Sequence, residues 1–175
     1  MTTSPDRSDL ELRIRRLEDI EAIRALKAKY SMHADEKYTD DHQLRSEQER
    51  DAIARDQASV FTDDAIWDGG QQFGVLRGKE AIHTSLKSIG WKFAMHYFLN
   101  PVIKVDGDRA TGRWMLWEVA TVNTTDTAVF LAAVTEDEYV RTPDGWRISK
   151  VCIRMKFITP FDRPWNVNKN DPLQS

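Results

Sequence analysis

The sequence has a single cysteine, Cys152, among its 175 residues, so no disulfide can form within the chain. It also lacks an apolar run long enough to cross a bilayer. The N-terminal stretch MTTSPDRSD has no apolar core of the kind that a secretory signal needs. Together these absences predict a protein of the reducing cytoplasm, with no membrane partner.

Lysine and arginine form no block in the sequence, and the formal net charge is -3 at pH 7. A chain of this charge lacks the basic surface that nucleic acids attract, so we expect no nucleic-acid partner. His33, His42 and His83 stand singly, without the spacing of a metal site. Phosphate-binding glycine loops and a GxSxG nucleophile motif are also missing. We therefore expect neither a metal nor another cofactor.

The chain is rich in tryptophan, with six residues, and 41% of its residues are hydrophobic. Tryptophan supplies large buried surfaces and flat walls for apolar ligands. A chain of 175 residues is long enough for one domain with a sizeable core. We predict a disordered leader over residues 1–9, a single domain over 10–161 and a C-terminal tail over 162–175.

Apolar residues recur at intervals of three and four from Leu10 to Tyr30, which predicts an amphipathic helix over about residues 10–34. Asp19 is a candidate cap for a second segment within it. The polar stretch that follows predicts a second helix ending near Phe61. Next, DDAIWDGGQQFG predicts a short strand, a Gly-Gly turn and another short strand, and GKEAIHTSLKSIG predicts a further helix.

The second half of the chain changes character to long alternating runs typical of strands. They lie at about Phe93–Val105, Arg109–Val122, Thr127–Arg141 and Trp146–Phe161. Asp-Gly turns in VDGDRA and RTPDGWR predict hairpins between them. Helices followed by an antiparallel meander indicate the α+β class, with the sheet curled around a helix.

Polar residues gather where the first predicted helix ends, with Tyr30, His33 and Asp35 close together. Asp35 lies ~140° around an ideal helix from Tyr30, so periodicity does not place the two on one stripe. Asp35 is therefore either a solvated aspartate at a helix end or a polar group at the mouth of a pocket.

Two further residues are candidates for chemistry. His96 lies in the most apolar strand and shares a face with Phe98 by alternation. It is either a hydrogen-bonded core histidine or a group for proton transfer near neutral pH. Arg154 shares a face with Ile148 and Cys152 by the same alternation. It either is buried beside an anionic or carbonyl partner or lies in solvent.

The order of several short segments resembles the SnoaL-like proteins, of the superfamily of cone-shaped α+β folds that includes nuclear transport factor two and scytalone dehydratase. These segments are DIEAIRALKAKYSMHADEK, FTDDAIWDGG, GKEAI, MHYFLNP, VDGDRATGRW and DEYVRTPDGWRIS, and together they span about residues 17–160. The resemblance implies a strongly curved antiparallel sheet wrapped around an N-terminal helix, a cystatin-like α+β barrel. Within the superfamily, the nearest likeness is to the bile acid 7-alpha-dehydratases.

This resemblance implies catalytic roles for Tyr30, Asp35 and His96. The bile acid enzymes have a tyrosine and an aspartate late in the first helix and a histidine in an MH strand that is followed by a proline, here Pro101. Hexachlorocyclohexane dehydrochlorinase and scytalone dehydratase carry a similar Asp–His pair. The arginine in the last strand of the pattern falls on Arg154.

Substrate-binding roles are implied for Arg154, Trp67 and Phe98. Arg154 would bind a carbonyl or carboxylate of the substrate. Trp67 stands where the bile acid enzymes have a second tyrosine, so an indole that only donates a hydrogen bond replaces a phenol. Phe98 joins the pocket wall on the face of His96.

By resemblance, the expected function is that of a cofactor-independent lyase, which eliminates a group such as hydroxide from a hydrophobic cyclic or steroid-like molecule. His96 would be the base, and Asp35 would hold its tautomer. A non-catalytic small-molecule-binding protein stays open, as does a protein like the β-subunits of ring-hydroxylating dioxygenases. So does an isomerase, epoxide hydrolase or cyclase in the same pocket. Long sheets in this superfamily pack face to face, so we expect a homodimer or homotrimer.

Overall fold

A computed structural model describes residues 6–88 and 90–162 of the chain. Its helices are α1 (Arg7–Asp35), α2 (Glu47–Ala58), α3 (Gly70–Phe73) and α4 (Lys79–Lys87). Its strands are β1 (Phe61–Asp68), β2 (Val75–Arg77), β3 (Trp91–Asp106), β4 (Arg109–Val122), β5 (Ala128–Thr142) and β6 (Gly145–Pro160). Residues 7–9 of the predicted leader are helical, while residues 1–5 and 163–175 lie outside the described residues.

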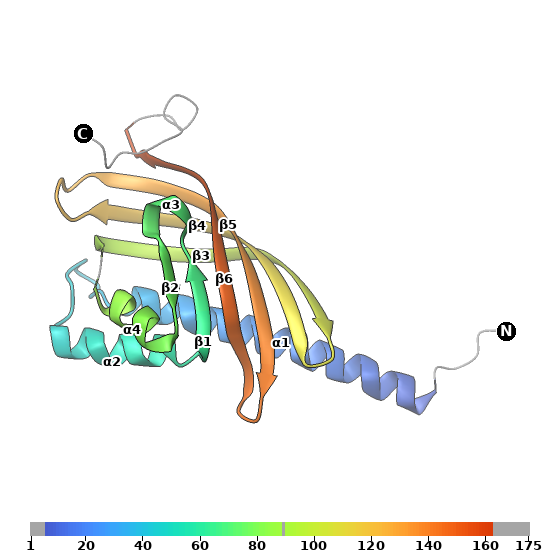
Figure 1. The fold of residues 1–175 in the computed structure, drawn as a ribbon. Helices are drawn as coiled ribbons and strands as arrows, with labels where there is room; N and C mark the ends of the chain where they lie inside the picture. Colours follow the sequence, from blue (N-terminus) through green and yellow to red (C-terminus); the bar gives the residue numbers. More distant parts are fainter. Residues whose placement is uncertain (1–5, 89, 163–175) are drawn as a thin grey trace.

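All six strands belong to one sheet in the order β2-β1-β6-β5-β4-β3. Strand β1 runs parallel to β6, and all other neighbours are antiparallel. The long strands β3 to β6 sweep over α1 in a strong curve (Figure 1). The predicted α+β fold is therefore confirmed, with one difference. Since β2 and β3 are the two edges of the sheet, the barrel is not closed.

Helix α1 buries only its second half against the sheet. Its buried residues are Asp19, Ile23, Lys27, Tyr30 and Ala34. The first turns project beyond the sheet (Figure 1), so the apolar residues Leu10, Ile14 and Leu17 are exposed. None of the described helices has both the length and the apolar composition to span a membrane.

Asp19 does not cap a helical segment, because α1 is continuous through it. Its carboxylate instead accepts hydrogen bonds from Arg141 Nη2 at 2.7 Å and Trp146 Nε1 at 3.0 Å. Burial opposes the charge, but these two donors hold the pKa of Asp19 below its ordinary value. This aspartate therefore fastens α1 to the β5–β6 hairpin.

Helix α2 begins with a capping box, in which Ser46 and Glu49 satisfy each other's backbone N–H groups. It ends at Ala58, because Phe61 already belongs to β1; the predicted helix was too long. The predicted Gly-Gly turn is also different, since Gly70 begins the short helix α3.

The four predicted long strands are confirmed within two residues at each end. Gly107 and Gly145 have φ of 57° and 97°, the backbone conformation that their hairpin turns require. Strand β6 departs from regular alternation, because Ile148 pairs with Tyr139 while Lys150 pairs with Glu138. Ser149 is thus an extra residue in a β-bulge, and the faces of β6 exchange beyond it.

Candidate active site

A cavity of about 360 Å³ opens between the concave face of the sheet, the C-terminal end of α1 and helix α4. Aromatic and aliphatic side chains form most of its wall: Tyr30, Tyr38, Trp67, Phe73, Leu86, Trp91, Phe98, Leu116, Leu131, Ile153 and Met155. Polar groups enter it at a few places: Lys37, Gln57, Ser85, Ser88, His96 and Glu118. A mostly apolar hollow with a few converging polar groups is the usual form of a small-molecule site.

Asp35 is in contact with His96, which lines this cavity. The Nδ1 atom of His96 lies 2.8 Å from Asp35 Oδ1, and the backbone N–H of His96 donates to the same carboxylate at 3.1 Å. Asp35 is the last residue of α1, and β3 packs alongside this helix. Asp35 lies ~140° around the helix from Tyr30, and the edge strand β3 reaches that other side of α1. The two residues therefore need not lie on one stripe for Asp35 to contact His96.

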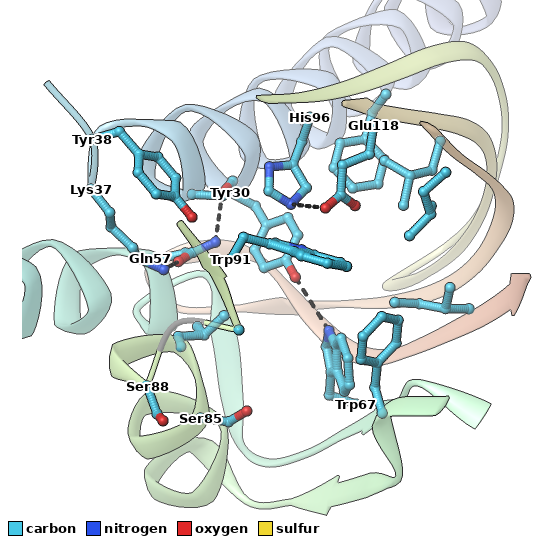
Figure 2. Close-up of a pocket in the computed structure, with 18 of the residues that line it drawn as sticks. Tyr30, Lys37, Tyr38, Gln57, Trp67, Ser85, Ser88, Trp91, His96 and Glu118 are labelled. Carbon is cyan, nitrogen blue, oxygen red and sulfur yellow. Dashed lines mark hydrogen bonds and ion pairs between the residues drawn. The ribbon is translucent and has the colours of Figure 1, made fainter. Parts of the chain in front are cut away.

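The hydrogen bond from His96 Nδ1 to Asp35 decides the tautomer of His96. A carboxylate only accepts hydrogen bonds, so Nδ1 carries the proton and Nε2 presents a lone pair. Nε2 faces Glu118, whose Oε1 lies 3.6 Å away (Figure 2). That distance is too long for a good hydrogen bond, so Nε2 is not tightly engaged.

Glu118 is a site residue that the sequence reasoning missed. It lies on β4 with 4% of its surface exposed, among inward-facing Trp114, Leu116 and Ala120. The signal was present, because alternation along WMLWEVA places this glutamate on the apolar face. A charged residue on the buried face of a strand is uncommon enough to mark a site.

The pKa values of this pair move in the same direction. Burial raises the pKa of the Glu118 carboxyl, although the His96 imidazolium opposes the shift. Burial alone would lower the pKa of His96, but the carboxylates of Glu118 and Asp35 outweigh it and raise that pKa. Both shifts favour bound protons, so each member of the pair holds its proton to a higher pH than it would in water.

Tyr30 presents its hydroxyl to the cavity from the middle of the α1 stripe. Trp67 Nε1 donates a hydrogen bond to the Tyr30 hydroxyl oxygen at 3.2 Å, and the ring of Phe98 lies 6.0 Å from the Tyr30 ring. Burial raises the pKa of Tyr30 to about 12. The phenol therefore stays protonated and has its own O–H left to donate. Tyr30, Trp67 and Phe98 all line the same cavity as His96.

Lys37 is a second site residue that the sequence reasoning missed. Its Nζ donates to Gln57 Oε1 at 2.6 Å, and Gln57 Nε2 donates to the backbone oxygen of Tyr30 at 3.0 Å. Within residues 6–88 and 90–162, no carboxylate lies within ion-pair distance of this ammonium. Burial lowers the pKa of Lys37 to about 8. A cation without an anionic partner in a cavity is suited to bind an oxygen of a ligand.

Arg154 does not belong to the cavity, contrary to the sequence prediction. The bulge at Ser149 turns Ile153 and Met155 inward, and both line the cavity. Arg154 consequently lies on the outer face, with 61% of its side chain exposed and Glu136 Oε2 at 3.6 Å from its Nε. Strict alternation from Ile148 failed because a bulge shifts the parity by one residue.

In the described part of the chain, no cluster of three or more His, Cys, Asp or Glu side chains is arranged to hold a metal ion.

The sequence of the chain was compared with protein families and with curated proteins. A sequence profile of the SnoaL-like domain matches residues 49–151. Comparison with curated protein sequences finds no match. The expected likeness to the bile acid 7-alpha-dehydratases stays a prediction.

Solved structures share the whole fold at low sequence identity. A hexachlorocyclohexane dehydrochlorinase of type 3 from Novosphingobium barchaimii has a TM-score of 0.70 and 22% identity, over 87% of this chain and 96% of that chain. A scytalone dehydratase-like protein from Novosphingobium aromaticivorans has a TM-score of 0.68 and 16% identity, over 91% and 96%. An NTF2-like protein with a cystatin-like fold from the same species has a TM-score of 0.61 and 24% identity, over 91% and 92%. At these identities the comparisons establish the fold.

Proposed function

Because this chain belongs to the SnoaL-like domain family and carries a carboxylate–imidazole pair at an apolar cavity, we propose that it is a cofactor-independent lyase for a small hydrophobic cyclic molecule. One observation carries the proposal. His96 is held through Nδ1 by Asp35 at 2.8 Å, while its Nε2 faces the cavity. That arrangement is the one a general base needs.

The proposed reaction begins with a proton on a carbon next to a carbonyl group. His96 Nε2 takes that proton, and the electrons of the C–H bond form an enolate. The enolate then collapses to a C=C bond, and the bond from the β-carbon to the leaving group breaks with both electrons on the leaving group. Asp35 stabilises the imidazolium that forms. Tyr30 donates its O–H to the enolate oxygen, where negative charge develops.

Cavity size narrows the substrate class. A volume of about 360 Å³ is near the lower end of the usual range for ligand sites. It suits one or two fused rings better than a four-ring steroid skeleton. Lys37 takes the place that the sequence prediction assigned to Arg154, since its ammonium faces the cavity and can bind a substrate oxygen. Cyclic β-hydroxy ketones combine these requirements.

A direct test is the conversion of 3-hydroxy-1-tetralone to 1-naphthol, followed by the fluorescence of the product. The substrate has two fused rings, and loss of water from it gives a tautomer of 1-naphthol. We expect turnover by the wild-type protein, loss of turnover by about 10²–10⁴ in His96→Ala, and a fall of orders of magnitude in Asp35→Asn.

His33→Ala is the matched control for this test, because His33 lies on α1 but does not line the cavity. It should keep wild-type turnover, and thermal melts should show that all three variants fold. A well-folded His96→Ala protein with wild-type turnover would remove His96 as the base. Binding of the ketone without turnover by the wild type would favour the non-catalytic binding protein instead.

A further inference from the structure

The Glu118 carboxylate in the cavity wall has a hydrogen-bonding neighbour in the Trp91 indole, but one of its two oxygens has no donor. Its Oε1 atom is buried and accepts no hydrogen bond from any described residue. The Nε2 atom of His96, at 3.6 Å, is the ionisable neighbour that it faces. A buried carboxylate oxygen that is left without a donor carries a desolvation cost.

Protonation relieves that cost. The Glu118 carboxyl and the His96 imidazole face each other at 3.6 Å, close enough for one proton to pass between them, and the pKa of each is raised above its ordinary value. With the proton on Glu118, His96 stays a neutral base and Glu118 becomes an acid directed at the same point in the cavity. The apolar neighbours Leu116 and Leu131 exclude water from that side, which favours the neutral form of both groups.

We propose that Glu118 is the general acid that protonates the leaving group while His96 removes the substrate proton. This inference rests on the proposed lyase function and makes it more specific. It specifies that the leaving group of the substrate is hydroxide, because hydroxide departs slowly unless it is protonated. Halide and acetate leave without such help.

The proton balance of the proposed cycle closes within the site. His96 Nε2 gains the proton from carbon, and Glu118 gives its proton to the departing oxygen, so water and the enone are the products. The site is then left with an imidazolium beside a carboxylate. Transfer of the proton from His96 Nε2 to Glu118 Oε1 restores the starting state without a proton from solvent.

Other charged and titratable groups surround the pair. Asp35 and Lys37 face it from the end of α1 and the residues after it, and the phenols of Tyr30 and Tyr38 lie nearby. The Trp91 indole is a further polar neighbour of the carboxylate. Asp35 hydrogen-bonds the far nitrogen of His96, and Lys37 is held by an amide. Glu118 is the carboxyl that faces Nε2 itself.

The activity test compares two leaving groups on one skeleton. Both 3-hydroxy-1-tetralone and 3-acetoxy-1-tetralone give 1-naphthol, but only the first needs an acid. We expect Glu118→Gln to lose about 10²–10⁴ in rate on the hydroxy compound and to stay close to wild type on the acetoxy compound. Glu136→Gln, an exposed substitution on β5, is the matched control and should leave both rates unchanged. Equal losses on both compounds in Glu118→Gln would overturn the proposal.

A second readout does not depend on turnover. The protein has four histidines, so ¹⁵N-histidine NMR with His96→Gln as the assignment variant gives the titration of His96 directly. Loss of the Glu118 charge should lower the pKa of the His96 imidazole, while Glu136→Gln should leave that pKa in place. An unchanged His96 titration in folded Glu118→Gln would show that the two groups share no proton and would overturn the proposal.

These two readouts separate the inference from the function on which it rests. If the wild type converts neither tetralone, the lyase proposal fails, and the NMR titration still decides whether Glu118 and His96 share a proton. If the wild type converts the acetoxy compound alone, the lyase proposal stands and Glu118 is not the acid.

Discussion

Buried ionisable side chains differ in how completely their charges are compensated. Asp19 accepts from two donors, and Lys27 is paired with Asp137 at 2.8 Å, although Asp137 Oδ1 has no donor. Lys37 has one amide oxygen, and Glu118 has an unsatisfied oxygen. Lys37 and Glu118 both line the cavity, where a bound ligand can supply the missing partner.

Glu118 should give the stability of the protein a recognisable pH dependence. Burial raises the pKa of Glu118 above its ordinary value of about 4.5, so the folded state holds a proton that the unfolded state has released. Stability therefore falls as pH rises above that ordinary value. Glutamine cannot release a proton, so Glu118→Gln should gain stability relative to wild type as pH rises above that ordinary value. Urea unfolding at several pH values measures this difference.

His96 gives the stability of the protein a pH dependence in the same direction as Glu118. Although burial favours its neutral form, Glu118 and Asp35 raise its pKa above the ordinary value of 6.5. Its contribution to stability is complete below that value and is lost as pH rises through the folded pKa. Part of that loss also disappears when Glu118 is replaced. A difference between Glu118→Gln and wild type that stays constant with pH would contradict the prediction, and Glu136→Gln should show no trend.

Lys37 should react as an unusually nucleophilic amine. Because burial lowers its pKa to about 8, about half of its side chains are neutral at that pH. An ordinary lysine with a pKa of about 10.4 is less than about 1% neutral there. Brief treatment with acetic anhydride at that pH, followed by peptide mass spectrometry, should therefore label Lys37 ahead of the exposed Lys29. Labelling of Lys29 first would count against the shifted pKa.

At the scale of elements, a buried polar chain joins α1 to the sheet beneath the cavity. Lys27 Nζ donates to Asp137 Oδ2 at 2.8 Å, Tyr139 donates to the same oxygen at 2.9 Å, and Trp114 Nε1 donates to the Tyr139 hydroxyl at 3.0 Å. The Lys27 ammonium also lies 4.1 Å from the centre of the Phe98 ring, which lines the cavity. This chain fixes the rotation of α1, and therefore the position of the catalytic candidates at its end.

Removing one member of that chain should be costly. In Lys27→Met the Asp137 carboxylate stays buried without its cation, so we expect a loss of about 3–5 kcal/mol in the free energy of unfolding. The double variant Lys27→Met with Asp137→Leu should recover a large part of that loss, because no charge remains buried. Urea unfolding measures both. Lys29→Met is the control, and a single variant as stable as this control would refute the prediction.

At the scale of the whole molecule, the convex side of the sheet exposes apolar side chains. The outer-face patch consists of Met95, Tyr97 and Leu99 of β3 with Met115 and Trp117 of β4, all of them at least 37% exposed. Tyr97 pairs with Trp117 and Leu99 with Met115 across the strands, so the patch is continuous. A continuous apolar patch on a sheet usually marks an interface. We propose that a second copy of this chain covers it, in a homodimer or homotrimer.

Light scattering after size-exclusion chromatography tests this oligomer. The wild type should elute as a dimer or trimer, and the double variant Tyr97→Lys with Met115→Lys should elute as a monomer, because two buried ammonium groups would destabilise the interface. Thr111→Lys lies on the same face of β4 outside the patch and should keep the wild-type mass. A monomeric wild type would contradict the expectation.

Local pattern in the sequence was sufficient for most of the fold. Spacings of three and four predicted α1, alternation predicted β3 to β6, and Asp-Gly pairs predicted the hairpins at Gly107 and Gly145. These signals work because neighbouring residues share one backbone geometry. The capping box of Ser46 and Glu49 was not predicted, although its pattern lies within four residues of chain. Resemblance supplied the curl of the sheet and the candidate pair Asp35 and His96.

Tertiary structure alone decided which side chains meet in the cavity. Asp35 and His96 are 61 residues apart, and β3 had to pass the end of α1 before their side chains could touch. One extra residue, Ser149, moved Arg154 out of the site, because a bulge is set by the pairing of two strands rather than by the sequence of one. Glu118 faces His96 only because β3 and β4 pair in this register. The sequence by itself determined the elements, whereas the long-range pairings determined the chemistry.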